Sequence, residues 1–249
     1  MVAIKTFGLT KRYGDLFAVD GIDLEIKRGE LFSLLGVNGA GKTTLIKMLS
    51  CLTKPSCGDA IVGLHSILSD PDEIKHIIAV SPQETAIAPN LSVYENLEFM
   101  CSIHGFSKEK REGIISDLSS RFDLHPVMKR RAGKLSGGWQ RRVSIAAALV
   151  SEPEILFLDE PTIGLDVLAR HELWKIIREL KGKITIILTT HYLEEAEALS
   201  DRVGVMKNGK LLAVDTVSGL CERAGKADFE NAFVSIIKEG THENDDISK

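Results

Sequence analysis

The chain has 249 residues, enough for one large or two modest domains with a core that needs no disulfide support. Hydrophobic residues make up 44% of it and charged residues 27%, which excludes wholesale disorder and a collagen-like or coiled-coil chain. The net charge of −4 provides no global positive field, so we expect no nucleic-acid partner.

The cysteines and the N-terminal residues indicate a chain that is not exported. Cys51, Cys57, Cys101 and Cys221 have neither the C-x-x-C spacing of a metal site nor the density of a disulfide scaffold. Residues 1–14 contain no apolar stretch of signal-peptide length, and no window in the sequence approaches the roughly 18 apolar residues of a membrane-spanning helix. We therefore expect a soluble, cytoplasmic protein with reduced thiols.

Short apolar runs alternate with amphipathic stretches, which is typical of an α/β sheet covered by helices on both faces. Near the N-terminus, Val2–Leu9 and Ala18–Ile26 are expected to form a smaller sheet. The core strands that follow are expected at Leu31–Leu35, Ile77–Val80, Ile155–Leu158 and Ile184–Leu188. Later in the chain, the smaller sheet is expected to gain Val203–Lys207 and Lys210–Val214, joined by the turn pair Asn208–Gly209.

The segment from residue 89 to residue 150 differs from its surroundings. Apolar residues recur there at helical spacing between Ser92 and Phe122, with few strand-forming residues. We predict an inserted α-helical subdomain over residues 89–150, between core segments 1–88 and 151–216. After residue 216 we expect a short C-terminal helix and a polar tail that is frayed from Gly240 to Lys249.

A glycine-rich loop follows the strand Leu31–Leu35 and precedes a predicted helix, Thr44–Leu52. Residues 36–43 read G-V-N-G-A-G-K-T and match G-x-x-x-x-G-K-[ST], a loop that binds nucleotide phosphates through backbone N–H groups and a helix N-terminus. The lysine supplies a charge for the β- and γ-phosphates, and the following threonine hydroxyl can bind Mg²⁺. We expect a P-loop NTPase core with a mainly parallel sheet and phosphate contacts from Gly36, Asn38, Gly39, Ala40, Gly41, Lys42, Thr43 and Thr44.

Two carboxylates end the core strand Ile155–Leu158, at the edge where open α/β sheets bind ligands. Asp159 is expected to hold Mg²⁺ through water, and Glu160 to orient or deprotonate the water that attacks the γ-phosphorus. An acidic pair at a strand end is, by itself, more often a solvated cap. The phosphate loop favours the metal and water roles.

A second glycine-rich sequence, L-S-G-G-W-Q-R-R at residues 135–142, opens a predicted helix that ends at Val150. Ser136, Gly137 and Gly138 at the start of that helix form a second anion site. Here the chain resembles the ATP-binding subunits of ABC transporters, whose LSGGQ signature has this position and spacing, and the resemblance extends over Ile4–Thr216. It implies that two cassettes, identical or different, pack head to tail, so that each signature closes over the γ-phosphate held by its partner.

Further positions match the family's pattern, although each is weak alone. Tyr13 lies 29 residues before Lys42, where the family stacks an aromatic ring on adenine. Gln83 resembles the glutamine that senses Mg²⁺ and the γ-phosphate and hinges the helical insert. Asp166 belongs to a loop resembling the one that crosses the dimer interface, and His191 resembles the switch histidine that contacts the γ-phosphate.

Two departures from the family's pattern leave details open. Trp139 stands where the family most often has glutamine, and Thr162-Ile163 replaces the commoner Ser-Ala before the dimer loop. The resemblance implies ATP and Mg²⁺ as cofactors. It implies catalytic roles for Glu160, His191 and Lys42, and metal contacts from Thr43, Gln83 and Asp159.

The resemblance favours an ATP-hydrolysing subunit that drives a separate membrane permease. The permease is expected to dock near the Gln83 loop and the predicted helix Leu91–His104, holding the cassette on the inner face of the cell membrane. The run T-T-H-Y-L-E-E-A-E at residues 189–197 looks like the branch that mostly exports drugs, antibiotics, lipids or polysaccharides.

Alternative functions differ in recognisable ways. An amino-acid-type importer subunit would also be a short cassette, so import stays open. A DNA-repair ATPase needs a long coiled-coil insertion, whereas Lys42 and Ser136 are only 94 positions apart without sustained heptads. A translation factor of this superfamily usually carries two cassettes, and the phosphate loop occurs once here.

Overall fold

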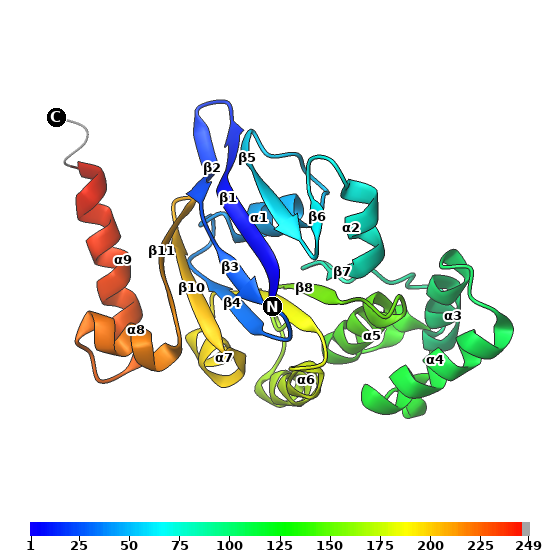
Figure 1. Ribbon diagram of the computed structural model, residues 1–249. Coiled ribbons are helices and arrows are strands. Elements are labelled where there is room, and N and C mark those ends of the chain that lie inside the picture. Colours follow the sequence, from blue (N-terminus) through cyan, green and yellow to red (C-terminus); the bar gives the residue numbers. More distant parts are fainter. Residues whose placement is uncertain (246–249) are drawn as a thin grey trace.

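The structure, a computed structural model, describes the backbone of residues 1–245 and the side chains of residues 1–240. Its main sheet has the strand order β11-β10-β4-β9-β8-β7, in which all neighbours are parallel except β10 and β11 (Figure 1). The bounds are β4 Leu31–Leu35, β7 Ile78–Ser81, β8 Ile155–Asp159, β9 Thr185–Thr190, β10 Arg202–Lys207 and β11 Lys210–Asp215. Every residue of β4, β8 and β9 is buried, as expected for parallel strands covered on both faces.

A smaller antiparallel sheet lies beside the main one (Figure 1). Its strands are β1 Val2–Tyr13, β2 Leu16–Ile22, β3 Glu25–Lys27, β5 Cys57–Val62 and β6 His65–Ser66. The expected N-terminal strands are present, but the second is divided into β2 and β3, which both pair with β1. Strands β5 and β6 were not predicted, because glycine, aspartate and cysteine interrupt the alternation of apolar residues.

The prediction that Val203–Lys207 and Lys210–Val214 belong to the smaller sheet was wrong. They form the expected hairpin, β10 and β11, but β10 pairs in parallel with β4 of the main sheet. A hairpin turn fixes how two strands pair with each other, whereas the sheet they join depends on long-range packing. Here Met206 lies against the phosphate loop, because its carbonyl oxygen would be 2.4 Å from a Cβ added at Gly36.

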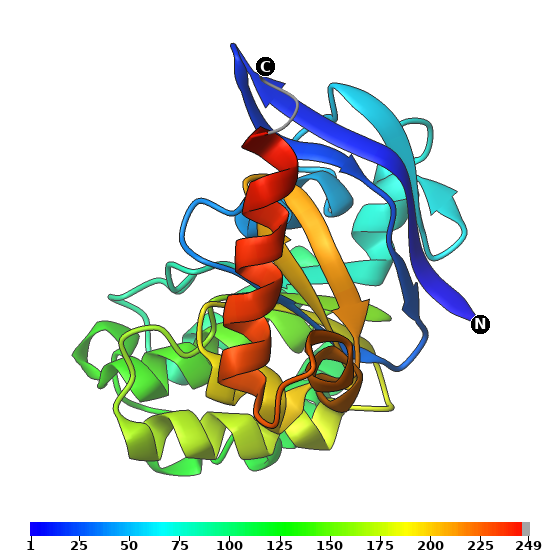
Figure 2. The ribbon, with the colours of Figure 1, turned by 90° about the vertical axis from the view of Figure 1, so that its left-hand side faces the viewer.

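Helices cover the main sheet on both sides (Figures 1 and 2). Four of them are α1 Lys42–Leu49, α2 Pro71–Ile77, α6 Val167–Leu180 and α7 Leu193–Leu199. Between β7 and β8 the chain forms α3 Val93–Ile103, α4 Lys108–Arg121, the short 3-10 helices η1 His125–Val127 and η2 Ala132–Lys134, and α5 Gly137–Leu149. Ser92 begins α3 with a capping box to Glu95, which explains why the helix starts there.

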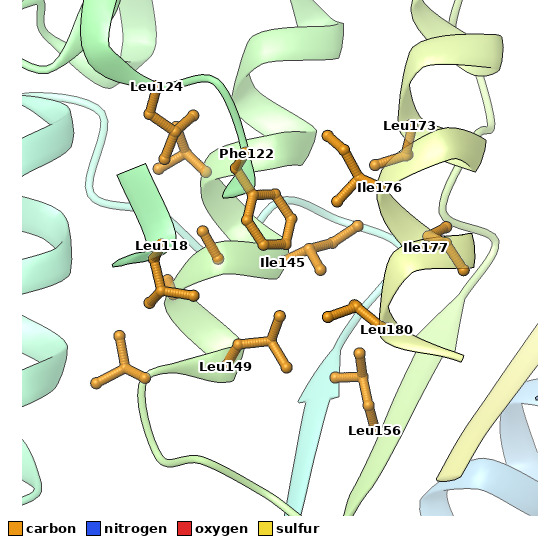
Figure 3. Packing of buried hydrophobic residues seen from close by; sticks show 14 of the residues in the cluster. Leu118, Phe122, Leu124, Ile145, Leu149, Leu156, Leu173, Ile176, Ile177 and Leu180 are labelled. Carbon is orange, nitrogen blue, oxygen red and sulfur yellow. The ribbon is translucent and has the colours of Figure 1, made fainter. Parts of the chain in front are cut away.

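A continuous apolar cluster joins the helices between β7 and β8 to the main sheet. Phe122, which follows α4, belongs to the same cluster as Ile145 of α5, Ile177 of α6 and Leu156 of β8 (Figure 3). Because α5 contributes to this cluster along its length, its N-terminus is held at a fixed place beside the first turn of α6.

The C-terminal part differs from the expected short helix and frayed tail. Helix α8 Val217–Ala224 is capped at its N-terminus by Thr216. Helix α9 Phe229–Asp245 follows it and lies beside β10 and β11 (Figure 2). Phe229 and Ile236 are buried against the main sheet, so the helix is held by packing. The tail expected from Gly240 therefore begins as helix, and residues 246–249 lie outside the described residues.

Within residues 1–245, no helix combines the length and the apolar character needed to cross a membrane.

Replacing Phe157, fully buried in β8, by alanine should destabilise the fold by about 3–5 kcal/mol, because it removes a large apolar side chain from the core. Phe99→Ala on α3 is the matched control, since that side chain is 55% exposed and its loss should cost less than about 1 kcal/mol. Urea denaturation measures the free energy of unfolding of both variants. Equal losses would contradict the assignment of β8 to the core.

Candidate functional site

The glycine-rich loop connects β4 to α1, as the sequence predicts. Gly41 precedes the first helical residue with φ +103°, and a Cβ there would lie 2.2 Å from the carbonyl oxygen of Ala18. A Cβ on Gly36 would meet the Met206 carbonyl just as closely. The neighbouring backbone thus leaves no room for side chains, and glycine is required at both ends of the loop.

Lys42 and Glu160 are buried and charged, and the partly exposed His191 lies beside Glu160. The Lys42 ammonium lies 2.6 Å from the carbonyl oxygen of Gly36 and 3.3 Å from Glu160 Oε1. The other oxygen of Glu160 lies 2.8 Å from His191 Nδ1. Lys42 and Glu160 are each only 6% exposed, so both charges depend on these partners. The three residues predicted as catalytic are therefore in direct contact.

A second polar group lies next to these three residues. Asp159, the last residue of β8, has its Oδ1 3.1 Å from Thr43 Oγ1 and accepts a 2.5 Å hydrogen bond from Thr189 Oγ1. Hydroxyl and carboxylate oxygens are ligands that Mg²⁺ prefers, usually together with substrate phosphates and water. Among residues 1–240, no group of three or more His, Cys, Asp and Glu side chains is arranged to hold a metal. The donor set therefore fits a magnesium ion that is bound jointly with a nucleotide.

Glu160 has an unusual backbone conformation. Its φ is +48°, a left-handed value that costs free energy for a residue other than glycine. Its N–H donates to both the carbonyl oxygen and the hydroxyl of Thr189, at 3.1 and 3.0 Å. The neighbouring strand β9 therefore holds the turn that aims the carboxylate at Lys42 and His191.

An open cleft of about 660 Å³ joins the phosphate loop to an aromatic surface. The Tyr13 side chain is 51% exposed and shares the cleft with Phe17, Gln83 and Glu160. Phe17 was not predicted, although the pairing of Arg12 with Phe17 and of Tyr13 with Leu16 places these residues at the same end of the β1–β2 hairpin. The loop residues lining the cleft are Asn38, Gly39, Ala40, Gly41, Lys42, Thr43 and Thr44.

The second glycine-rich sequence, residues 135–142, lies outside this cleft. Ser136 is exposed at the N-terminus of α5, its side chain makes no capping hydrogen bond, and neither it nor Gly137 or Gly138 lines the cleft. A Cβ on Gly138 would lie 2.9 Å from Cβ of Ala169 in α6, so glycine permits the close approach of the two helices. The chain thus presents two separate helix N-termini suited to anions.

Asp166 and Trp139 have clear local contacts. Asp166 caps α6 by accepting a 2.9 Å hydrogen bond from the N–H of Ala169, which ties the predicted dimer loop to the helix that touches Gly138. Trp139 packs against the apolar cluster, and the Arg142 guanidinium lies 4.8 Å from its ring. The tryptophan that replaces the usual glutamine is therefore a packing residue within this chain.

Arg141 is a site residue that the sequence did not reveal. Its guanidinium is 3% exposed, and its N–H groups donate to five carbonyl oxygens. The acceptors are those of Pro82, Gln83, Asp159, Glu160 and Pro161. Five donors are all that a guanidinium has, and burial lowers the pKa of Arg141 to about 10, so it remains charged at neutral pH. Arg141 thereby links α5 to the Gln83 loop and to the turn of Glu160.

Comparisons with known proteins identify the family to which the chain belongs. A family model described as ABC transporter matches residues 19–163. The chain is 40% identical over 224 residues to the daunorubicin resistance ATP-binding protein DrrA3 of Streptomyces coeruleorubidus, covering 90% of this chain and 71% of that protein. It is 35% identical over 246 residues to the linearmycin resistance ATP-binding protein LnrL of Bacillus subtilis, covering 95% of this chain and 79% of that one.

A solved structure extends the likeness to three dimensions. It is a dimeric structure of a post-hydrolysis state of an ATP-binding cassette bound to ADP and Pi, with a TM-score of 0.76 and 27% identity. The superposition covers 86% of this chain and 98% of that chain. The prediction of a P-loop NTPase core is thereby confirmed, and the chain belongs to the ABC transporter family as one of its ATP-binding cassettes.

Proposed function

We propose that this chain is the ATP-hydrolysing subunit of an ABC transporter, which binds MgATP between two cassettes and drives a separate membrane permease. The observation that carries the proposal is the contact of Glu160 with both Lys42 and His191. A lysine for the phosphates, a carboxylate for water and a histidine beside it are the groups that hydrolysis of a γ-phosphate requires.

ATP binding begins at the phosphate loop. The backbone N–H groups of residues 38–44 bind the phosphates, and Lys42 turns from the Gly36 carbonyl to the β- and γ-phosphates. The adenine ring stacks on Tyr13, whose exposed ring lies in the same cleft, and Phe17 widens the apolar surface beneath the nucleotide.

Thr43 and Asp159 would hold Mg²⁺ together with the phosphate oxygens, and Gln83, which lines the same cleft from the loop after β7, would be a further ligand. When bound, the ion neutralises the charge that develops on the phosphate oxygens. Thr189 keeps the Asp159 carboxylate in place through its hydrogen bond.

Hydrolysis centres on the Glu160 carboxylate. It accepts a hydrogen bond from the attacking water, orients it towards the γ-phosphorus and takes its proton. His191, held against Glu160 Oε2, contacts the γ-phosphate from the other side of the carboxylate. As the bond between the γ-phosphorus and the oxygen of ADP breaks, Lys42 stabilises the negative charge on the oxygens of ADP and of the released phosphate.

A second cassette completes the site. Ser136, Gly137 and Gly138 lie outside their own chain's cleft, so we propose that they bind the γ-phosphate held by a partner in a head-to-tail dimer. Asp166 lies in the loop that crosses between the cassettes. The dimeric state of the similar solved cassette supports this arrangement.

The permease is proposed to dock on α3 beside the Gln83 loop. Phe99 and Ile103, one turn apart on this helix, are 55% and 60% exposed and form an apolar surface that a membrane subunit can cover. This docking places the cassette at the inner face of the membrane. The two resistance proteins named above support export of an antibiotic-like compound over import.

Glu160→Gln should lower the rate of ATP hydrolysis at least a hundredfold while ATP still binds, because the amide cannot accept the proton of water. A size measurement of this variant should show a dimer when ATP is present and a smaller species when it is not. Glu154→Gln, at the opposite end of the same strand and exposed, is the matched control and should hydrolyse ATP like the unaltered chain. Hydrolysis by the Glu160 variant at the original rate would contradict the assignment.

Arg141→Lys should lower kcat for ATP hydrolysis by about tenfold or more, since an ammonium has three donors where five carbonyl oxygens now accept. Arg121→Lys on the surface of α4 is the control, because its ion pair with Asp117 is exposed. Circular dichroism verifies that both variants are folded. An unchanged kcat would show that the Gln83 loop and the Glu160 turn do not need this link.

A further inference from the structure

Glu195 is a fully buried carboxyl group that the proposed mechanism does not use. It lies on α7, four residues after His191, and is 0% exposed. Its Oε1 accepts a 3.0 Å hydrogen bond from Trp174 Nε1. Trp174 lies on α6, the helix that Asp166 caps, so this hydrogen bond connects the helix after the switch histidine to the helix after the predicted dimer loop.

Two buried oxygen atoms near this bond have no hydrogen-bond partner among the described residues. They are Glu195 Oε2 and Thr162 Oγ1. The Thr162 hydroxyl lies close enough to Glu195 to influence its ionisation, as does that of Thr190. Thr162 stands two residues after Glu160, and Thr190 directly precedes His191. A buried polar atom without a hydrogen-bond partner costs free energy. Apolar packing alone therefore does not explain why these residues lie here.

The charged groups that face Glu195 are Arg141 of α5 and Glu160. Arg141 is already bonded to five carbonyl oxygens and makes no ion pair with Glu195. Burial therefore raises the pKa of the Glu195 carboxyl, and the nearby Glu160 charge acts in the same direction. Trp174 Nε1 donates the hydrogen bond that this carboxyl accepts, and the Thr162 hydroxyl lies beside it.

We propose that Glu195 is a positioning residue for ATP hydrolysis, which bridges the His191 segment to the dimer loop through Trp174 and Thr162. The inference rests on the function proposed above. Glu195 touches neither the cleft nor the phosphate loop, so it acts through other residues. When the partner cassette moves the Asp166 loop, α6 and Thr162 move with it, and Glu195 passes this displacement to α7 and to His191.

The test compares kcat and KM for ATP in the full chain. Glu195→Leu should lower kcat about tenfold or more with KM within about twofold, because the nucleotide contacts lie outside this cluster. Glu195→Gln, which keeps the shape and a side-chain oxygen that can accept from Trp174 Nε1, should keep kcat within about twofold. Trp174→Phe should lower kcat less than Glu195→Leu does, and combining the two should be no worse than Glu195→Leu alone.

Glu197→Leu, exposed on the same helix, is the matched control and should leave both constants unchanged. An unchanged kcat in Glu195→Leu, or an equal loss in Glu195→Gln, would overturn the inference. If Glu195→Leu does not fold, Trp174→Phe decides, since an unaltered kcat there contradicts the bridge. Hydrolysis by Glu160→Gln at the original rate would instead contradict the function proposed above.

Discussion

The site depends on one constraint, the parallel pairing of β4, β8 and β9. Because these strands run in the same direction as neighbours, their carboxyl ends meet at one edge of the sheet. Lys42, Glu160 and His191 follow the three strands and are brought into contact although up to 149 positions separate them. One oxygen of the buried Glu160 carboxylate contacts Lys42 and the other contacts His191. Glu160 therefore connects the residues that follow the three strands.

Buried polar groups away from this edge link the site to α5 and α6. Arg141 joins α5, which carries the signature, to the Gln83 loop and the Glu160 turn. Glu195 joins the helix after His191 to the helix after Asp166. Each uses hydrogen bonds to backbone or buried side chains, and we propose that these bonds pass the shift of a loop at an interface to the residues around Glu160.

Much of the site could be predicted from sequence because its residues lie at strand ends within short, distinctive patterns. The strand Leu31–Leu35 and the pair Asp159–Glu160 are examples, since continuous apolar runs mark buried parallel strands. Arg141 and Glu195 could not be found in this way, because a charged residue on a helix is usually solvated and its burial depends on packing between distant segments. The sheet that β10 joins was missed for the same reason.

The central claim is that each ATP is hydrolysed between the phosphate loop of one chain and the signature of another. Mixing differently tagged Lys42→Ala and Ser136→Arg chains tests it most directly, because each homodimer has two defective sites whereas the mixed dimer has one intact site. The account predicts that purified mixed dimers regain ATP hydrolysis to about half the original rate, if the two sites act independently. Mixed dimers as inactive as the separate variants would contradict the claim.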